Sequence, residues 1–293
     1  MVTPVKPRTG PSIREFLRYY VLVAAQRRRR TAAGIVSEIK RNSASNQEVR
    51  RSGQLLVDGD ELGRVLRHLA RQKLIAPSGR TWRSTREGRR KLALYDRQKE
   101  NSRDSKNRAA RVLLRWLGPR RAGKVLDVGT GDGYLAFQLA ERGHRVLGID
   151  SGPFDYSKNS IKVARQKAEG KGLRVEFRKM SVAGLRRRQA RFQVVVASQA
   201  VHCMRDQPRC LKAICGLLEP GGTFLCMDLR VGLSGFLKHG WHSFLALSEE
   251  EWAELLPQCG FEEPAFRRVG GYLVVKARTP RTPKRSSRPR KPR

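Results

Sequence analysis

The sequence predicts an α/β domain with a mostly parallel sheet, preceded by a small basic α+β domain. Three observations carry this prediction. A strand-like segment, residues 124–128, runs into a loop with alternating glycines and then into a helix-like segment from Tyr134. Apolar segments typical of buried strands recur downstream between amphipathic helices, which is the pattern of parallel strands joined by helical crossovers. The excess of basic residues falls at the two ends of the chain and largely spares the α/β part.

Residues 12–95 are expected to form three helices, a hairpin and a closing helix. A capping-box pattern at Ser12 opens the first helix, which is expected to end near Ala25, and Thr31 caps a second helix predicted over 32–39. The third helix is predicted from about Asp58 to Leu74. It carries an apolar stripe and, on nearly the opposite side at the same spacing, a basic stripe. The apolar stripe is Leu62, Val65, Leu66 and Leu69, and the basic stripe is Arg64, Arg67, His68 and Arg71.

A hairpin is predicted over residues 74–83, because Pro77, Ser78 and Gly79 are turn residues between strand-like flanks. Ser84 or Thr85 then caps a basic helix that is expected to end near Tyr95.

Helix, helix, basic helix and hairpin in this order resemble the winged-helix domains of transcription regulators. In those domains the third helix enters the major groove and the wing contacts phosphates. The resemblance implies nucleic-acid contacts from Arg64, Arg67, His68, Arg71, Arg80 and Arg83. The interval 42–58 is longer than a tight helix-turn-helix turn. Winged helices also serve as dimerisation or docking modules, so both uses stay open.

The segment from Lys124 to Tyr134 predicts a nucleoside-binding loop. Glycines at 129, 131 and 133 follow a buried strand, and they let a ligand approach bare backbone at the start of the next helix. The following strand ends in Asp150, a carboxylate placed to accept both hydroxyls of a ribose. The sixth position of the dinucleotide fingerprint is Tyr134 instead of glycine, which favours a ligand without a diphosphate.

The same loop resembles motif I of class I S-adenosylmethionine-dependent methyltransferases. Later segments resemble this family's other elements, so the resemblance covers residues 116–277: a buried strand at 192–198, a helix leading into Glu219-Pro220-Gly221-Gly222, a strand at 223–228, a helix at 252–256, Cys259-Gly260-Phe261 and a last strand at 272–277. It implies a Rossmann-like fold with a seven-stranded sheet.

The resemblance also implies S-adenosylmethionine as the cofactor. Its contacts would come from Asp127, Gly129, Thr130, Gly131, Gly133, Asp150, Ser151, Ser181 and Ser198, and a side chain at Gly129 is expected to fill the space of the methionine moiety. Two positions depart from the family. Gln193 stands where the fourth strand often begins with Asp. The loop 178–182 lacks the acidic residue that often binds the adenine amino group, which leaves Ser181 or the backbone.

Methyl transfer needs a positioned acceptor and, for some acceptors, a group that removes a proton. Ser198 and His202 follow the predicted fourth strand, and Asp228 ends the fifth, so all three are candidate catalytic residues. His202 is the candidate general base because the unperturbed pKa of histidine is near neutrality. The insertion that carries His239, Trp241 and His242 is a predicted lid over the acceptor.

The net charge of +36 is unevenly distributed. Residues 1–124 hold 32 Lys and Arg against 10 Asp and Glu, residues 125–277 hold 22 against 16, and residues 278–293 hold 8 against none. Such a field attracts polyanions, most of all nucleic acid. The polar ends, 1–11 and 278–293, are expected to be disordered, and 96–115 to be a charged linker that merges into a helix.

Three functions stay open: a methyltransferase acting on or recruited to nucleic acid, a small-molecule methyltransferase whose winged helix docks or dimerises, and a regulator with a non-catalytic cofactor-sensing domain. Residues 198–201, Ser-Gln-Ala-Val, lack the Pro-Pro-aromatic motif of DNA amine methyltransferases, and no Pro-Cys nucleophile motif occurs. A fragment of residues 104–277 is expected to keep cofactor binding, and to keep turnover only if the acceptor is small.

Five cysteines without a C-x-x-C pair predict reduced thiols and no metal site. No apolar run approaches the roughly 20 residues that span a bilayer, and residues 1–10 lack an apolar signal segment. The expected location is the cytoplasm, or the nucleoid or nucleus when bound to nucleic acid, and the oligomeric state stays open.

Overall fold

A computed structural model of the chain describes residues 11–27, 31–35, 37, 59–100, 104–118, 123–151, 160–186, 190–204, 206–233, 235–236, 243 and 245–281. The chain divides into two compact units. The N-terminal unit comprises residues 1–108, 229–248 and 268–272, and the sheet unit comprises residues 109–228, 249–267 and 273–293. The predicted interval 42–58, most of the two polar ends and the three lid residues at 239, 241 and 242 lie outside the described residues.

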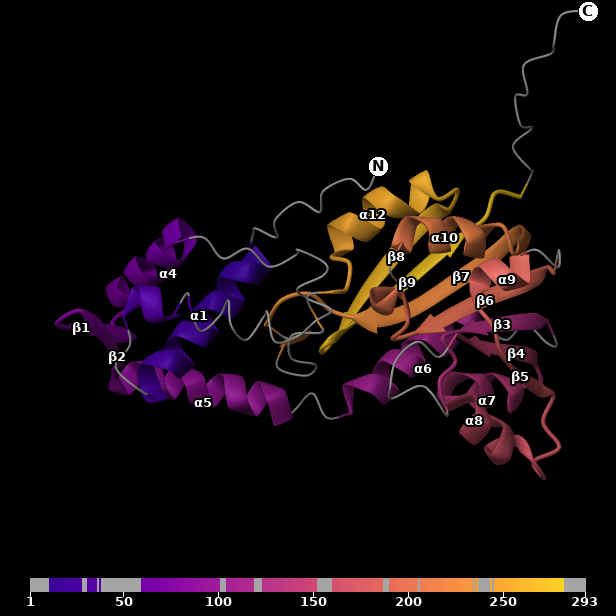
Figure 1. The fold of residues 1–293 in the computed structure, drawn as a ribbon, viewed down its shortest axis with the longest axis horizontal. Coiled ribbons are helices and arrows are strands. Elements are labelled where there is room, and N and C mark those ends of the chain that lie inside the picture. Colours follow the sequence, from indigo (N-terminus) through magenta and orange to yellow (C-terminus); the bar gives the residue numbers. More distant parts are fainter. Residues whose placement is uncertain are drawn as a thin grey trace, which may run out of the picture. The chain divides into compact units, whose positions relative to one another are not determined.

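The N-terminal unit contains the helices and the hairpin that the sequence predicts (Figure 1). Its elements are α1 (Pro11–Arg27), a helical segment at 32–35, α4 (Gly59–Arg71), β1 (Ile75–Ser78), β2 (Thr81–Ser84) and α5 (Arg86–Glu100). β1 and β2 pair antiparallel. The order of elements is the expected one, while the assignment to the winged-helix family stays a prediction.

Local hydrogen bonds explain where these helices begin and end. The hydroxyl of Thr31 accepts from the N–H of Gly34 at 3.0 Å, and that of Thr85 accepts from Gly88 at 3.0 Å, so both act as N-caps. α4 ends at Arg71, three residues before the predicted end. Lys73 has a left-handed φ of 56°, and the N–H of Leu74 donates to the carbonyl of Leu69, which closes the helix.

The amphipathic prediction for α4 is confirmed. Its apolar stripe is at most 4% exposed and packs in one core with residues of α1 and α5. The arginines at 64, 67 and 71 are exposed, and His68 is half-buried. α5 continues to Glu100, five residues beyond the predicted end, and α6 (Ser105–Leu117) follows, so helix covers most of the predicted linker.

The sheet unit is built on a seven-stranded sheet with the strand order β5-β4-β3-β6-β7-β9-β8. The strands are β3 (Lys124–Val128), β4 (Arg145–Asp150), β5 (Val175–Lys179), β6 (Phe192–Ser198), β7 (Leu218–Leu229), β8 (Glu262–Val269) and β9 (Tyr272–Arg278). β3 pairs parallel with β4 and β6, and the parallel pairing continues to β5 and β7. The predicted mostly parallel sheet is confirmed.

β9 runs antiparallel to β7. Arg230 pairs with Gly271 beyond one end of the two strands and Gly222 pairs with Thr279 at the other, so the residue numbers run in opposite directions. β8 was not predicted individually, because it is an exposed strand without an apolar face.

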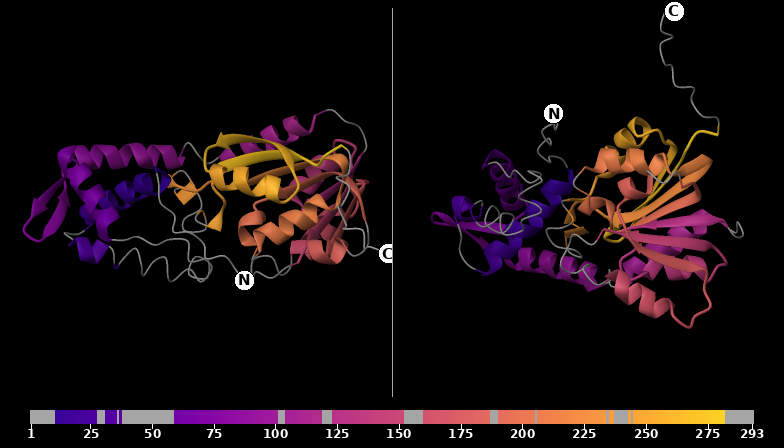
Figure 2. Two further views of the ribbon diagram at one scale, coloured as in Figure 1. Left: turned by 90° about the horizontal axis from the view of Figure 1, so that it is seen from above. Right: turned by 45° about the vertical axis from the view of Figure 1, so that its right-hand side comes forward.

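Helices cover both faces of this sheet. α6, α7 (Tyr134–Ala140) and α8 (Ser160–Ala168) lie on one face, and α9 (Val182–Arg186), α10 (Gln207–Cys215) and α12 (Glu249–Gln258) lie on the other (Figures 1 and 2). The chain order reverses at β3, which lies between β4 and β6. In open α/β sheets, ligands bind outside the carboxyl ends of the strands at such a reversal.

Candidate functional site

The loop after β3 adopts the conformation that its glycines allow. Gly129, Gly131 and Gly133 have φ values of 68°, 55° and 86°, a region that residues with a side chain rarely occupy. The N–H groups of Gly129 and Thr130 both donate to the carbonyl of Ile149 at the end of β4. The loop is therefore fixed to the carboxyl edge of the sheet, where the sequence predicts the cofactor.

The three glycines have different surroundings. A Cβ atom on Gly129 would lie 2.4 Å from the Cβ of Ala200, and one on Gly133 would lie 2.6 Å from the ring of Phe137. A Cβ atom on Gly131 would meet nothing within 4 Å. Gly129 and Gly133 thus permit close packing, while Gly131 borders open space.

Asp127 is a buried carboxylate below this loop. It is 1% exposed, and its Oδ2 accepts a hydrogen bond from the hydroxyl of Thr130 at 2.7 Å. Its Oδ1 makes no hydrogen bond of normal geometry among the described residues. Burial raises the pKa of Asp127 to about 7, the Thr130 hydrogen bond opposes the rise, and the charge of Asp150 adds to it. A cationic ligand nearby would stabilise the ionised form.

Asp150 lies at the end of β4, as predicted, and one of its carboxylate oxygens accepts from the N–H of Gly131 at 3.1 Å. The sequence placed the two residues in one site, and the hydrogen bond joins them. It ties the carboxylate to the part of the loop that borders open space. A carboxylate held there can also accept hydrogen bonds from ribose hydroxyls.

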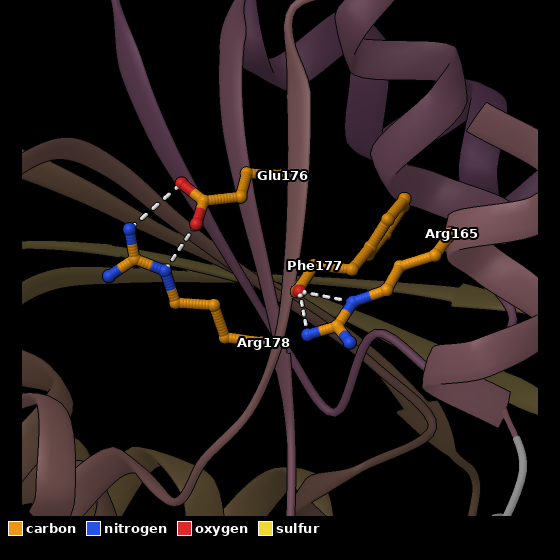
Figure 3. Close-up of polar contacts among 4 residues, drawn as sticks. All are labelled: Arg165, Glu176, Phe177 and Arg178. Carbon is orange, nitrogen blue, oxygen red and sulfur yellow. Dashed lines mark hydrogen bonds and ion pairs between the residues drawn. The ribbon is translucent and has the colours of Figure 1, made fainter. Parts of the chain in front are cut away.

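The side chain of Phe177, in β5, packs close to the glycine loop, near Gly133. Its ring packs edge-on against that of Phe137, with centroids 5.5 Å apart, and it would collide with a Cβ atom on Gly148 at 2.6 Å. Arg165 of α8 donates two hydrogen bonds, of 3.0 and 2.9 Å, to the carbonyl of Phe177 (Figure 3). β5 is an edge strand, so this guanidinium satisfies a carbonyl on the free edge.

The end of β5 lacks the acidic residue common in the resembled family. Glu176 is the carboxylate on this strand, and it forms an ion pair with Arg178 on the face opposite Phe177 (Figure 3). Ser181, the predicted substitute, is exposed and its hydroxyl accepts from the N–H of Gly184, so it caps α9. Ser151 follows Asp150 and is exposed. No hydrogen bond among the described residues joins Ser151 or Ser181 to the loop.

His202 and Asp228 form a buried pair that the sequence named only as separate candidates. Nδ1 of His202 lies 2.5 Å from Oδ1 of Asp228, and the backbone N–H of His202 donates to Oδ2 at 2.9 Å. The two side chains are 7% and 1% exposed. His202 belongs to a short 3₁₀ helix after β6, and Asp228 lies near the end of β7, so neighbouring parallel strands bring them together.

The pKa of His202 is not near neutrality, contrary to the basis on which the sequence selected it. Burial lowers this pKa, but the carboxylate of Asp228 and the thiol of Cys203 more than reverse the effect and raise it to about 10. The carboxylate also fixes the ring so that Nε2 is the nitrogen left to exchange a proton.

The link between β6 and this pair holds a residue, Gln199, whose position beyond the strand was expected but whose strained backbone was not. Gln199 has a left-handed φ of 53°, and its N–H donates to the carbonyl of Met227 at 2.8 Å. Ser198, a candidate for both cofactor and catalysis, ends β6 opposite Met227. A non-glycine residue in this conformation costs about 1–2 kcal/mol, and such strain concentrates at functional sites.

The predicted nucleic-acid residues lie in the N-terminal unit. Arg64, Arg67 and Arg71 of α4 and Arg80 and Arg83 of the hairpin are all exposed. Burial, followed by the charges of Arg18 and Arg71, lowers the pKa of His68, so this side chain carries less positive charge than an unperturbed histidine would.

Among the described residues, no group of three His, Cys, Asp or Glu side chains could hold a metal ion. Within the same residues, no helix has the length and apolarity needed to cross a bilayer.

The carboxyl edge fits S-adenosylmethionine on three observations. The backbone at Gly131 borders open space, Asp150 supplies a carboxylate beside it, and Asp127 keeps an unsatisfied buried oxygen below the loop. A nucleoside ribose and a cationic methionine moiety need these groups.

Comparisons with known proteins agree with this geometry. Residues 119–256 match the family model of a methyltransferase domain. A ubiquinone biosynthesis O-methyltransferase of Dinoroseobacter shibae is 31% identical over 165 residues, which are 51% of this chain and 64% of that protein. A protein of the same name from Leptothrix cholodnii is 40% identical over 132 residues, which are 43% of this chain and 54% of that protein. The chain thus spans less than two thirds of these relatives.

Among solved structures, a chain of the complex between the Haloferax volcanii Trm112 methyltransferase activator and a methyltransferase has a TM-score of 0.50 to this chain at 20% identity. The match covers 63% of this chain and 95% of that one, and it shows a shared fold. The match to a methyltransferase domain thus falls mostly within the sheet unit, and the sheet topology agrees with the predicted Rossmann-like fold.

Proposed function

We propose that this protein transfers a methyl group from S-adenosylmethionine to a hydroxyl oxygen of a small molecule, with His202 as the group that takes the acceptor's proton. The observation that carries the proposal is the buried His202–Asp228 pair at the carboxyl edge of the sheet. It belongs to the same unit as the glycine loop, and Gly129 of that loop packs against Ala200, two residues before His202.

The cofactor assignment is supported by the glycine loop and the two carboxylates near it. The backbone of Gly131 and the carboxylate of Asp150 would hold the nucleoside, and the charge of Asp127 would favour a cationic ligand. When bound, S-adenosylmethionine supplies an activated methyl carbon. The chain's own residues then have to position the acceptor oxygen and accept its proton.

The acceptor class is supported by the proton affinity of His202. Phenolic hydroxyls have a pKa of about 10. Asp228 raises the pKa of His202 to about 10, so its neutral imidazole is a stronger base towards such a hydroxyl than an unperturbed histidine. The relatives named as ubiquinone biosynthesis O-methyltransferases favour an oxygen acceptor in this proposal. A phenol-like hydroxyl is therefore the preferred acceptor.

The test uses the full chain and S-adenosylmethionine with a labelled methyl group. A panel of phenols and a bacterial metabolite extract should give a labelled small product. His202→Gln should lose at least about 100-fold in turnover, since a general base contributes a factor of this size, while S-adenosylhomocysteine still binds with its normal affinity. Unchanged turnover in this variant would remove His202 from the mechanism.

Recruitment to nucleic acid is a second candidate function, and one observation favours it: five arginines of α4 and the hairpin are exposed in a unit with a large excess of basic residues. Such a surface binds phosphates, and its affinity falls steeply as salt rises. In this arrangement nucleic acid would localise the enzyme, and methyl transfer to nucleic acid itself remains an alternative outcome of the labelling assay.

A labelled DNA or RNA duplex tests this second function in a fluorescence anisotropy titration of the full chain. The triple variant Arg64→Glu, Arg67→Glu and Arg71→Glu should abolish binding at low salt. The matched control reverses the same amount of charge at three exposed arginines outside the N-terminal unit: Arg115, Arg174 and Arg267. If both triple variants lose the same affinity for the duplex, net charge alone explains the binding and the surface of α4 has no special role. If the unmodified chain does not bind the duplex, this function is excluded.

A further inference from the structure

A segment that follows β7 completes the core of the N-terminal unit. Leu233 is 1% exposed and packs among apolar residues of α1, α4 and α5. The ring of Phe236 packs edge-on against that of Phe16, with centroids 4.7 Å apart, and lies 6.3 Å from that of Tyr19. Among the described residues, a core otherwise formed by residues before 96 therefore receives three side chains from the segment after β7: Val231, Leu233 and Phe236.

The connection from β7 to these side chains is short and tightly packed. The N–H of Arg230 donates to the carbonyl of Gly271 at 2.8 Å, and its guanidinium donates to that of Gly270 at 3.3 Å. The N–H of Phe236 donates to the carbonyl of Gly232 at 2.9 Å. A Cβ atom on Gly235 would lie 1.6 Å from the carbonyl oxygen of Arg230. Such a turn has little freedom to deform.

The same connection begins at the catalytic pair. Asp228 precedes Leu233 by five residues and Phe236 by eight, and its carboxylate accepts two hydrogen bonds from His202. A displacement of the end of β7 by about 1 Å would break contacts of this length, because hydrogen bonds weaken steeply beyond their normal distance.

We propose that Leu233 and Phe236 are positioning residues of the methyl-transfer site, which act by anchoring the end of β7 and with it the carboxylate of Asp228. This inference rests on the proposed role of the His202–Asp228 pair. The effect would pass along the short covalent connection of residues 229–236 to Asp228. The proposed cofactor contacts of the glycine loop and Asp150 follow β3 and β4, so they are expected to change less than the His202–Asp228 pair.

The experiment compares Leu233→Ala with Leu92→Ala in the full chain. Both variants remove the same atoms from a buried leucine of the same core, but Leu92 belongs to α5 and has no short connection to Asp228. Titration of the five histidines is followed by NMR, with the His202 signal assigned from its loss in His202→Gln. Affinity for S-adenosylhomocysteine and the free energy of unfolding are measured in parallel.

Leu233→Ala should lower the titration midpoint of His202 by about one pH unit or more, because a displaced carboxylate raises this pKa less. Leu92→Ala should leave the midpoint unchanged while losing similar stability, and both variants should bind S-adenosylhomocysteine normally. Phe236→Leu, a milder change on the same segment, should shift the midpoint in the same direction.

An unchanged midpoint in both Leu233→Ala and Phe236→Leu, or an equal shift in Leu92→Ala, overturns the inference. The readout is a property of the resting protein, so it separates this inference from the proposed function. A shifted midpoint in a protein that methylates no hydroxyl would contradict the proposed function alone.

Discussion

Alanine substitutions at Gly129 and Gly131 should differ in their main effect: the first should chiefly lower stability and the second chiefly lower cofactor affinity. Both glycines belong to one loop, and both have a left-handed φ. A side chain in this conformation costs about 1–2 kcal/mol at either position. At Gly129 the new Cβ would also lie 2.4 Å from that of Ala200, and such overpacking costs about 1–3 kcal/mol more. Gly129→Ala should therefore destabilise the protein by about 2–5 kcal/mol, and Gly131→Ala by only about 1–2 kcal/mol.

The affinity for the cofactor should depend more directly on Gly131, although its substitution costs less stability than that of Gly129. The methyl group of Gly131→Ala would occupy open space beside Asp150, where the nucleoside is proposed to bind. This variant should lose at least about tenfold in affinity for S-adenosylhomocysteine, or about 1.4 kcal/mol, while it stays folded. Denaturant unfolding and calorimetric titration measure the two quantities. Normal affinity in Gly131→Ala would refute the placement of the cofactor above this glycine.

Three further predictions concern ionisable groups. Asp150→Ala should weaken S-adenosylhomocysteine binding by about 2–4 kcal/mol in calorimetry, because two charge-assisted hydrogen bonds to ribose are lost; equal affinity would rule the residue out. The logarithm of turnover should rise with a slope near one from about pH 7 to 9 and level off near the His202 pKa of about 10, because the neutral imidazole is the active form; a flat profile contradicts this. Burial raises the folded-state pKa of Asp127 from 3.8 to about 7, so its ionisation destabilises the fold as pH rises across this range, by up to about 4 kcal/mol. In Asp127→Asn, the free energy of unfolding should fall less between about pH 4 and pH 7 than in the unmodified protein. If the two proteins show the same pH dependence, the raised pKa of Asp127 is contradicted.

Local sequence patterns were sufficient to predict the glycine loop and the mostly parallel sheet. Alternating glycines, a strand before them and a carboxylate at the end of the next strand are all encoded within residues 124–150. The structure places Gly131 and Asp150 in hydrogen-bond contact, as the sequence led us to expect of one site. The sequence did not distinguish the glycines, because the neighbour that restricts Gly129 is Ala200, which is distant in the chain.

The properties of the His202–Asp228 pair could not be predicted in the same way. His202 and Asp228 were each selected from their position after a strand, but their pairing depends on the register between β6 and β7. That contact changes the pKa of His202 from near neutral to about 10. A residue type therefore predicts the kind of chemistry, and the tertiary contact sets the pH at which it operates.

The role of residues 229–236 also depends on contacts distant in sequence. The sequence suggested two separable halves, so that a fragment of residues 104–277 would keep turnover on a small acceptor. In the structure this fragment would lack α1, α4 and α5, whose residues pack around Leu233 and Phe236. We now expect the fragment to lose turnover with either kind of acceptor, so it no longer separates the two functions.

The most direct test of the proposed function identifies the atom that receives the methyl group. The full chain is incubated with S-adenosylmethionine carrying a ¹³C methyl group, a phenol panel and, separately, duplex DNA and RNA. The carbon chemical shift of the product distinguishes methyl groups on oxygen, nitrogen and carbon. We predict an O-methyl signal on a small phenol that disappears in His202→Gln. A methyl signal found only on nucleic acid would contradict the proposed function.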